Sequence, residues 1–212
     1  MKSIKQHGLM HQNGLIHRIM CAIYDLIILN LFWVITSIPI ITIGASTTSL
    51  FYCVGKLVRG EDLNILRDYI NSFKVNFKQG TLIWCILLSM YMVIYTNITF
   101  FSELPMVWAR TIVYIQLPLL IILVFITIFI FPILARFNSS TTQIFKASFI
   151  LGVRHFFQCI ICLIIFLLGF ILIRYIPALI LFMLSSLIAL GIYAVLSKVL
   201  EGYGPEDSAI KN

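Results

Sequence analysis

Four long stretches of this sequence contain no Asp, Glu, Lys or Arg, and they constrain the fold more than any other feature. They are residues 82–101, 111–134, 155–173 and 175–197. A helix needs about 20 apolar residues to cross the roughly 30 Å hydrocarbon layer of a membrane, and backbone polar groups at that depth are satisfied only in a helix or a closed barrel. The stretches lack the alternation of barrel strands. We therefore expect membrane-spanning helices.

The composition supports the same conclusion. Apolar residues make up 61% of the 212 residues and charged residues only 11%, whereas soluble domains have roughly 45–50% and about 25%. This balance excludes a soluble enzyme, a disordered chain and a secreted disulfide scaffold. The net charge of +7 does not call for a nucleic acid, because in a membrane protein Lys and Arg report orientation and contact with lipid. We expect an all-α transmembrane helix bundle, with residues 1–212 in a single domain.

The first apolar region must contain a break. Residues 19–55 include only one charged residue, Asp25, and are far too many for one span at 1.5 Å per residue. Pro39 biases its predecessor away from helical geometry and removes a donor, and Gly44 tolerates a turn. Either two spans meet here, or one span is followed by a re-entrant segment.

The distribution of Lys and Arg favours two spans. With six crossings and both termini in the cytoplasm, 13 of the 15 Lys and Arg residues lie inside and only Arg110 and Arg174 outside. A five-crossing model leaves ten inside and five outside, a weaker bias. A re-entrant second segment stays possible, because Gly44–Ser49 is unusually small and polar, although small residues also allow close helix packing. The expected spans are residues 19–38, 40–58, 81–101, 111–134, 155–173 and 175–197.

An amphipathic helix is expected at residues 61–79, between the second and third spans. Apolar residues recur there at steps of three and four, and basic residues lie near its end, where the helix dipole favours them. Gly60 and Gly80 bracket the segment. The helix suits either the lipid interface or a protein partner. Its candidate contact residues are Leu63, Leu66, Ile70, Phe73, Phe77, Lys74 and Lys78.

The second long inner loop predicts a further helix. Asn138, Ser139 and Ser140 offer an N-cap, and the helix would run to about Arg154 and lead straight into the next span. The outer loops are very short. The chain therefore has little with which to capture a large extracellular ligand.

Four polar side chains are candidates for a role within the membrane: Asp25, Asn30, Thr36 and Arg136. A charge in a span is costly unless it is paired, protonated or near the interface. We expect Asp25 to reach the lipid head groups or a cation such as Lys56 or Arg59, and a proton or substrate site is the alternative. Asn30 and Thr36 are most simply explained by hydrogen bonds between helices.

Motifs for catalysis are missing from the sequence. There is no H-E-x-x-H, no G-x-S-x-G and no glycine-rich phosphate-binding loop, so neither a zinc site nor an activated serine nor a nucleotide site is indicated. We expect no enzymatic activity, no cofactor and no metal.

Several segments resemble the YesL family of small bacterial membrane proteins, and the densest similarity lies within residues 25–44. They are Asp25-Leu26, Leu29-Asn30-Leu31-Phe32-Trp33, Ser37-Ile38-Pro39, Thr42-Ile43-Gly44-Ala45, Phe73-Lys74-x-Asn76-Phe77-Lys78-Gln79 and Pro132-x-Leu134-Ala135-Arg136-Phe137.

The resemblance implies an accessory or regulatory membrane subunit of a carbohydrate ABC importer in the bacterial cytoplasmic membrane. Its partners would be the permease subunits, with the ATPase and the solute-binding protein in the same complex. The E-A-A-x-x-x-G loop by which permeases engage the ATPase is absent, which favours a place beside the permease pair. The alternative is an independent small-solute transporter or channel that uses Asp25, Asn30 and Gly44–Ser49.

Overall fold

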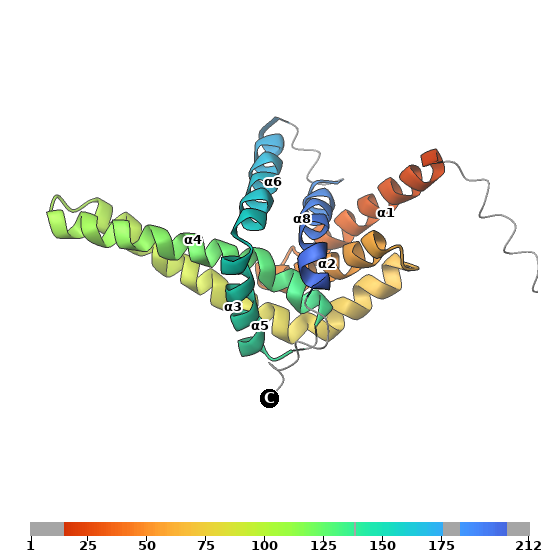
Figure 1. Ribbon diagram of the computed structural model, residues 1–212, viewed down its shortest axis with the longest axis horizontal. Coiled ribbons are helices and arrows are strands. Elements are labelled where there is room, and N and C mark those ends of the chain that lie inside the picture. The colour runs from red at the N-terminus through yellow and green to blue at the C-terminus, as the bar shows by residue number, and fades with distance from the viewer. Residues whose placement is uncertain (1–14, 138, 176–182, 203–212) are drawn as a thin grey trace, which may run out of the picture.

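The computed structural model describes residues 15–137, 139–175 and 183–202, which form helices joined by short connections (Figure 1). In this part of the chain there are seven α-helices and one 3-10 turn, and no β-strand. The prediction of an all-helical fold is confirmed. The elements are α1 (Leu15–Thr36), η1 (Ile40–Thr42), α2 (Ile43–Arg59), α3 (Ile65–Ser102), α4 (Val107–Arg136), α5 (Thr141–Arg154), α6 (Phe156–Tyr175) and α8 (Leu184–Glu201).

The chain breaks between α1 and α2, around Pro39. The side chain of Thr42 closes this turn, because its hydroxyl lies 2.6 Å from the carbonyl oxygen of Thr36 and 2.7 Å from that of Pro39. Helix α2 then runs without interruption to Arg59 and ends at Gly60, whose φ of 69° is left-handed. Only glycine adopts this conformation without strain.

Helix α3 differs from the expected amphipathic helix at residues 61–79. It begins at Ile65, after the N-cap residue Asn64 whose side chain accepts from the backbone N–H of Arg67, and it continues without a break to Ser102. The predicted boundary at Gly80 is wrong. Gly80 is buried against α2, where a Cβ atom would lie 3.0 Å from the Cα of Ala45, so this glycine serves helix packing. Figure 1 shows α3 bent about midway along its length.

Helices α3 and α4 form a long antiparallel hairpin (Figure 1). Helix α5 follows Ser140, whose backbone N–H donates to the side-chain oxygen of Gln143 in a capping box. As expected, α5 runs to Arg154 and is followed after one residue by α6, which begins at Phe156, but the two helices are not collinear. His155, with φ −111° and ψ 48°, interrupts the helix, and α5 and α6 meet at an angle of 97°.

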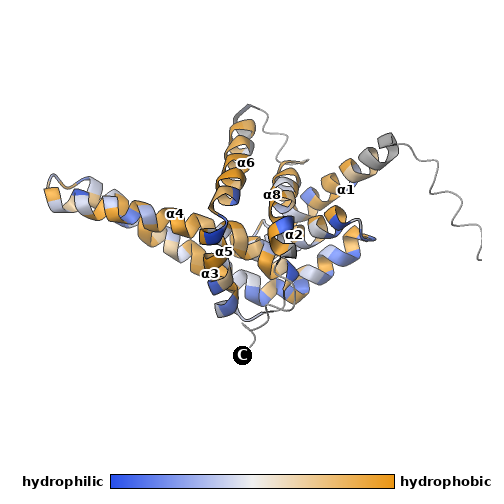
Figure 2. Ribbon diagram, viewed as in Figure 1, coloured by the Kyte–Doolittle hydropathy of each residue, from blue (hydrophilic) through white to orange (hydrophobic). Residues whose placement is uncertain are grey.

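The buried core lies where α2 packs against α3, α4 and α8. It includes Val54 of α2, Ile83 of α3 and Leu196 of α8, all fully buried. Away from this centre the helices expose large apolar side chains, especially along α6 and the outer part of the α3–α4 hairpin (Figure 2). Apolar surface on this scale is not stable in water and marks contact with lipid or protein.

Three of the described helical segments are long and apolar enough to cross a membrane, namely Ile40–Arg59, Ile65–Ser102 and Val107–Arg136. A fourth crossing results if the bent pair Thr141–Arg154 and Phe156–Leu172 acts as one span. The apolar helices Met20–Thr36 and Leu184–Leu200 are shorter. The expected last span, 175–197, includes residues 176–182, which lie outside the described part of the chain.

Candidate functional site

The first half of α3 presents three parallel rows of side chains, each displaced by one residue from the next. The core-facing row contains Ile65, Tyr69, Ser72, Asn76 and Gly80, and Tyr69 and Gly80 are fully or nearly fully buried. Residues at i, i+4, i+7 and i+11 share one face of a helix. This row therefore fixes the orientation of the helix against α2, and the other two rows face away from the core.

The second row is the apolar stripe that the sequence predicted, and all of it except the half-buried Phe73 is exposed. We call Leu66, Ile70, Phe73 and Phe77 the α3 stripe. Leu66 is 58% exposed and Phe77 41%, and the rings of Phe73 and Phe77 contact each other edge to face at 5.5 Å. The last of the predicted apolar residues, Leu63, lies before the helix and packs partly on the core.

The third row makes one edge of the α3 stripe cationic. Arg67, Lys74 and Lys78 are exposed and adjoin Leu66, Phe73 and Phe77 around the helix. None of the three takes part in either of the salt bridges found in the described residues, Lys56–Asp68 and Arg59–Glu61. The surface thus combines uncovered apolar area with positive charge along one side.

Asn30 lies in the interior and joins two helices. Its side chain is fully buried, and its Oδ1 accepts hydrogen bonds from the backbone N–H of Ser185 at 3.0 Å and from the Ser185 hydroxyl. The backbone N–H of Ser186 donates to the same oxygen at 3.4 Å. Asn30 of α1 therefore caps the first turn of α8.

Thr36 belongs to a second buried contact, centred on Tyr69. The two hydroxyl groups share a hydrogen bond of 2.7 Å, and the Tyr69 hydroxyl also lies 3.4 Å from the backbone oxygen of Ser46. The Tyr69 ring packs on Phe32 with centroids 5.5 Å apart. Sequence reasoning missed Tyr69, because a tyrosine among polar residues of an amphipathic helix gives no local sign of burial. This contact ties α1, α2 and α3 together.

Replacing Tyr69 with phenylalanine should therefore lower the free energy of unfolding by about 1 kcal/mol, the usual contribution of a buried hydrogen bond. Chemical denaturation of the detergent-solubilised protein measures the effect. Tyr95→Phe is the matched control, because the Tyr95 side chain is 68% exposed. Equal stability of the two variants would show that the Tyr69 hydroxyl does not hold these helices.

The expected pairing of Asp25 with Lys56 or Arg59 is not found. Lys56 Nζ donates to Asp68 at 2.8 Å, and the guanidinium of Arg59 binds both carboxylate oxygens of Glu61. Glu61 follows Arg59 by two residues, and Asp68 lies in the first turn of α3 beside the end of α2, so both cations find acidic partners near the α2–α3 connection. The hydrogen bonds from Arg59 also hold the pKa of Glu61 below its ordinary value.

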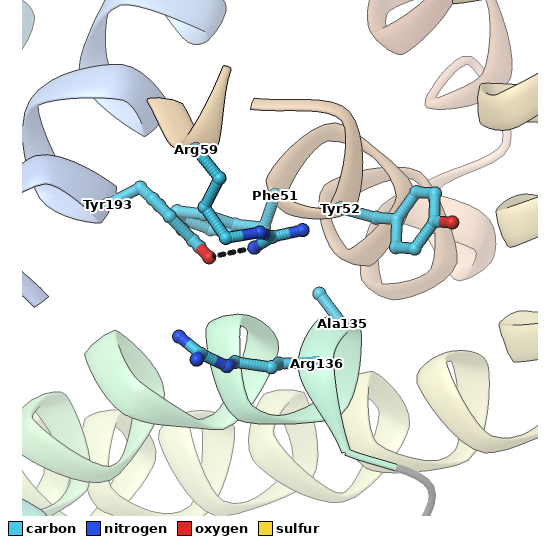
Figure 3. A pocket seen from close by; sticks show the side chains of 6 residues that line it. All are labelled: Phe51, Tyr52, Arg59, Ala135, Arg136 and Tyr193. Carbon is cyan, nitrogen blue, oxygen red and sulfur yellow. Dashed lines mark hydrogen bonds between the residues drawn. The ribbon is translucent and has the colours of Figure 1, made fainter. Parts of the chain in front are cut away.

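Arg136, the fourth polar candidate, faces a small cavity between α2, α4 and α8 (Figure 3). The cavity has a volume of about 80 Å³ and is lined by Phe51, Tyr52, Arg59, Ala135, Arg136 and Tyr193. Arg59 Nη1 donates to the Tyr193 hydroxyl at 2.6 Å. Arg136 Nη1 is buried and has no hydrogen-bond partner. Sequence reasoning did not foresee this meeting of two arginines, which are far apart in the chain.

The small polar run of α2 packs against α3. Three of its hydroxyl groups are used within the helix, because Ser46, Thr48 and Ser49 each donate to the backbone oxygen four residues earlier. All three are fully buried. Among the described residues no group of three or more His, Cys, Asp or Glu side chains could hold a metal ion.

Residues 26–98 match a family model described as a protein of unknown function, DUF624. No curated protein and no solved structure matches the chain. The matched region runs from α1 through the Pro39 break and α2 into α3, as far as Ile98. It therefore contains the α3 stripe, Asn30 and the Tyr69 contact, but not Arg136.

Proposed function

We propose that this chain is a non-catalytic accessory subunit of a bacterial carbohydrate ABC import system, and that it binds the permease subunits through the α3 stripe. The observation that carries the proposal is the stripe itself, in which Leu66, Ile70 and Phe77 are exposed and Phe73 is half-buried, beside the buried face of the same helix. The carbohydrate importer follows from the sequence similarity of residues 25–44 and 73–79 to the YesL family.

The proposal includes an orientation in the membrane. The chain crosses the cytoplasmic membrane six times, with α1 and α8 as the first and last spans and both termini in the cytoplasm. The distribution of Lys and Arg supports it, with 13 of 15 on the inner side. In this orientation the α3 stripe lies on the cytoplasmic side, where it could contact the cytoplasmic loops of a permease.

The chemistry of the partner surface follows from the two exposed rows of α3. An apolar groove would receive Leu66, Ile70, Phe73 and Phe77, in the manner of an amphipathic helix in a groove. Acidic residues at one rim of that groove would face Arg67, Lys74 and Lys78. Such charges add specificity and speed of association more than affinity.

The alternative of an independent transporter has less support. Apart from Asp25, the groups proposed to line its pathway are engaged in packing: Asn30 caps α8, and the hydroxyls of Ser46, Thr48 and Ser49 bind their own helix. An isolated, reconstituted chain would have to move solute for this alternative to hold.

Copurification tests the proposal. A tagged chain extracted with a mild detergent should recover a permease, its ATPase or a solute-binding protein. The double variant Leu66→Ser and Phe77→Ser should lose most of this recovery, because the few hot-spot residues of an interface each contribute about 2 kcal/mol or more, which is about thirtyfold in affinity.

Val75→Ser provides the matched control for that experiment. Val75 is 67% exposed and lies on the opposite side of α3 from the stripe, so its replacement should leave recovery unchanged. If the double variant recovers the same proteins as the parent, the stripe lies against lipid. Recovery of only a self-oligomer in several mild detergents would contradict the accessory role.

A further inference from the structure

The cavity between α2, α4 and α8 places two arginines at one small space. Arg59 ends α2 and Arg136 ends α4, and Figure 3 shows both guanidinium groups at the same cavity, with the Tyr193 hydroxyl beside Arg59. Gly55 makes room for this arrangement, because a Cβ atom there would lie 2.8 Å from the Tyr193 ring.

The charges around the cavity do not balance. Glu61 compensates Arg59, but neither of the salt bridges found in the described residues involves Arg136. Its guanidinium lies over the ring of Phe137, 5.8 Å from the centroid, and it shares the charge of Glu61 with Arg59, because both arginines lower the pKa of that carboxyl. One positive charge therefore remains at a partly buried site, which is costly without an anion.

The hydrogen bonds are also incomplete. Arg136 Nη1 is buried without a partner, although buried donors are nearly always satisfied by protein, water or ligand. The cavity of about 80 Å³ exceeds the space one water needs, which is about 10–15 Å³. It is large enough for a tetrahedral oxyanion, whose oxygens match the fork of donors on a guanidinium.

We infer that this cavity is a binding site for a phosphate group, held by Arg136 together with the Arg59 and Tyr193 pair. The site does not depend on the proposed importer function. In the proposed orientation both arginines end their spans on the cytoplasmic side, at the depth of lipid head groups. Basic pockets between membrane helices on that side are suited to anionic head groups. The phosphate belongs either to such a lipid or to a soluble phosphorylated compound.

The experiment measures the thermal unfolding of the full chain in a mild detergent at constant ionic strength. The probes are dihexanoyl-phosphatidylglycerol, dihexanoyl-phosphatidylcholine and inorganic phosphate. A rise in Tm with phosphatidylglycerol but not with inorganic phosphate assigns the site to a lipid head group. A rise with inorganic phosphate assigns it to soluble phosphate compounds. Either result supports the site when Arg136 is required for it.

The requirement for Arg136 is tested with Arg136→Gln, which keeps a shorter polar side chain without the charge. The apparent affinity for the active probe should fall about tenfold to hundredfold, as expected for a lost charge-assisted hydrogen bond. Lys146→Gln is the matched control, because Lys146 is exposed on α5 and its loss changes the net charge equally. That variant should bind as the parent does.

A second variant covers the case in which Arg136→Gln does not fold. Ala135→Leu should fill the cavity while both arginines stay charged, and it should also abolish the rise in Tm. The inference is overturned if no probe raises the Tm of the parent protein. Binding of parental strength in the Arg136→Gln or Ala135→Leu variant would overturn it as well.

Discussion

Among the glycines in the described part of the chain, replacement of Gly44 with alanine should destabilise the protein most. A Cβ atom at this position would lie 2.2 Å from the backbone oxygen of Gly80 and 2.6 Å from the Cβ of Trp84. Real contacts of this kind are never so short, and a backbone atom cannot rotate away. Helices α2 and α3 would have to separate along their whole contact.

The expected loss is about 1–3 kcal/mol or more, the usual cost of overpacking a filled interior. Alanine also favours a helix over glycine by about 1 kcal/mol, which acts in the opposite direction. The steric cost should exceed this gain in helix propensity, because the nearest neighbouring atom belongs to the backbone of α3 and cannot move independently. Denaturant titration of the protein in detergent measures the difference in free energy of unfolding.

Two further glycines give a graded series. Gly80→Ala should cost less than Gly44→Ala, because its nearest contacts, the N and Cα of Ala45, would lie at 3.0 Å. Gly202→Ala is the matched control, since its nearest contact is at 3.6 Å, an ordinary packing distance. If Gly44→Ala were as stable as Gly202→Ala, the close crossing of α2 and α3 would be refuted.

Local sequence chemistry was sufficient to predict that the fold is helical and where several of the helices begin or end. Pro39 interrupts the first apolar region, Gly60 ends α2 and Ser140 caps α5, because each acts on residues within four positions of itself. The exposed apolar face of residues 66–77 could also be predicted, since helical periodicity needs no knowledge of the rest of the fold.

The contacts that hold the candidate sites together could not be predicted in this way. The hydrogen bond between Asn30 and Ser185 joins residues 155 positions apart, and that between Arg59 and Tyr193 joins residues 134 positions apart. No periodicity encodes which helices become neighbours. The wrong interpretation of Gly80 has the same cause. Local rules make a glycine at this position a helix end, whereas in the structure it allows α2 and α3 to cross closely.

Replacing Asn30 with leucine should release the start of α8 from α1. The first N–H groups of any helix lack partners within that helix, and Met183, the N-cap residue of α8, provides no side-chain hydrogen bond. Asn30 supplies the acceptor for two of these groups. Without it, buried N–H donors remain unsatisfied, at a cost of about 1–3 kcal/mol.

The variant Ser185→Ala distinguishes the capping of backbone N–H groups by Asn30 from its hydrogen bond to the Ser185 hydroxyl. It removes only the side-chain hydrogen bond to Asn30 and leaves the backbone N–H groups capped, so it should cost about 1 kcal/mol or less. In the double variant the two effects should not add, because the residues share a contact. Full additivity would show that Asn30 acts elsewhere.

Hydrogen exchange locates the effect within the chain. In the Asn30→Leu variant, the amides of Ser185 and Ser186 should exchange faster, because loss of the acceptor lowers the free energy of local opening. The amides of α3 around Ile83 should be unchanged, since Ile83 packs in the core where α2 meets α3. An equal increase in exchange rate in α3 and α8 would mean that the variant weakens the whole fold. Asn30 would then not act specifically as a cap of α8.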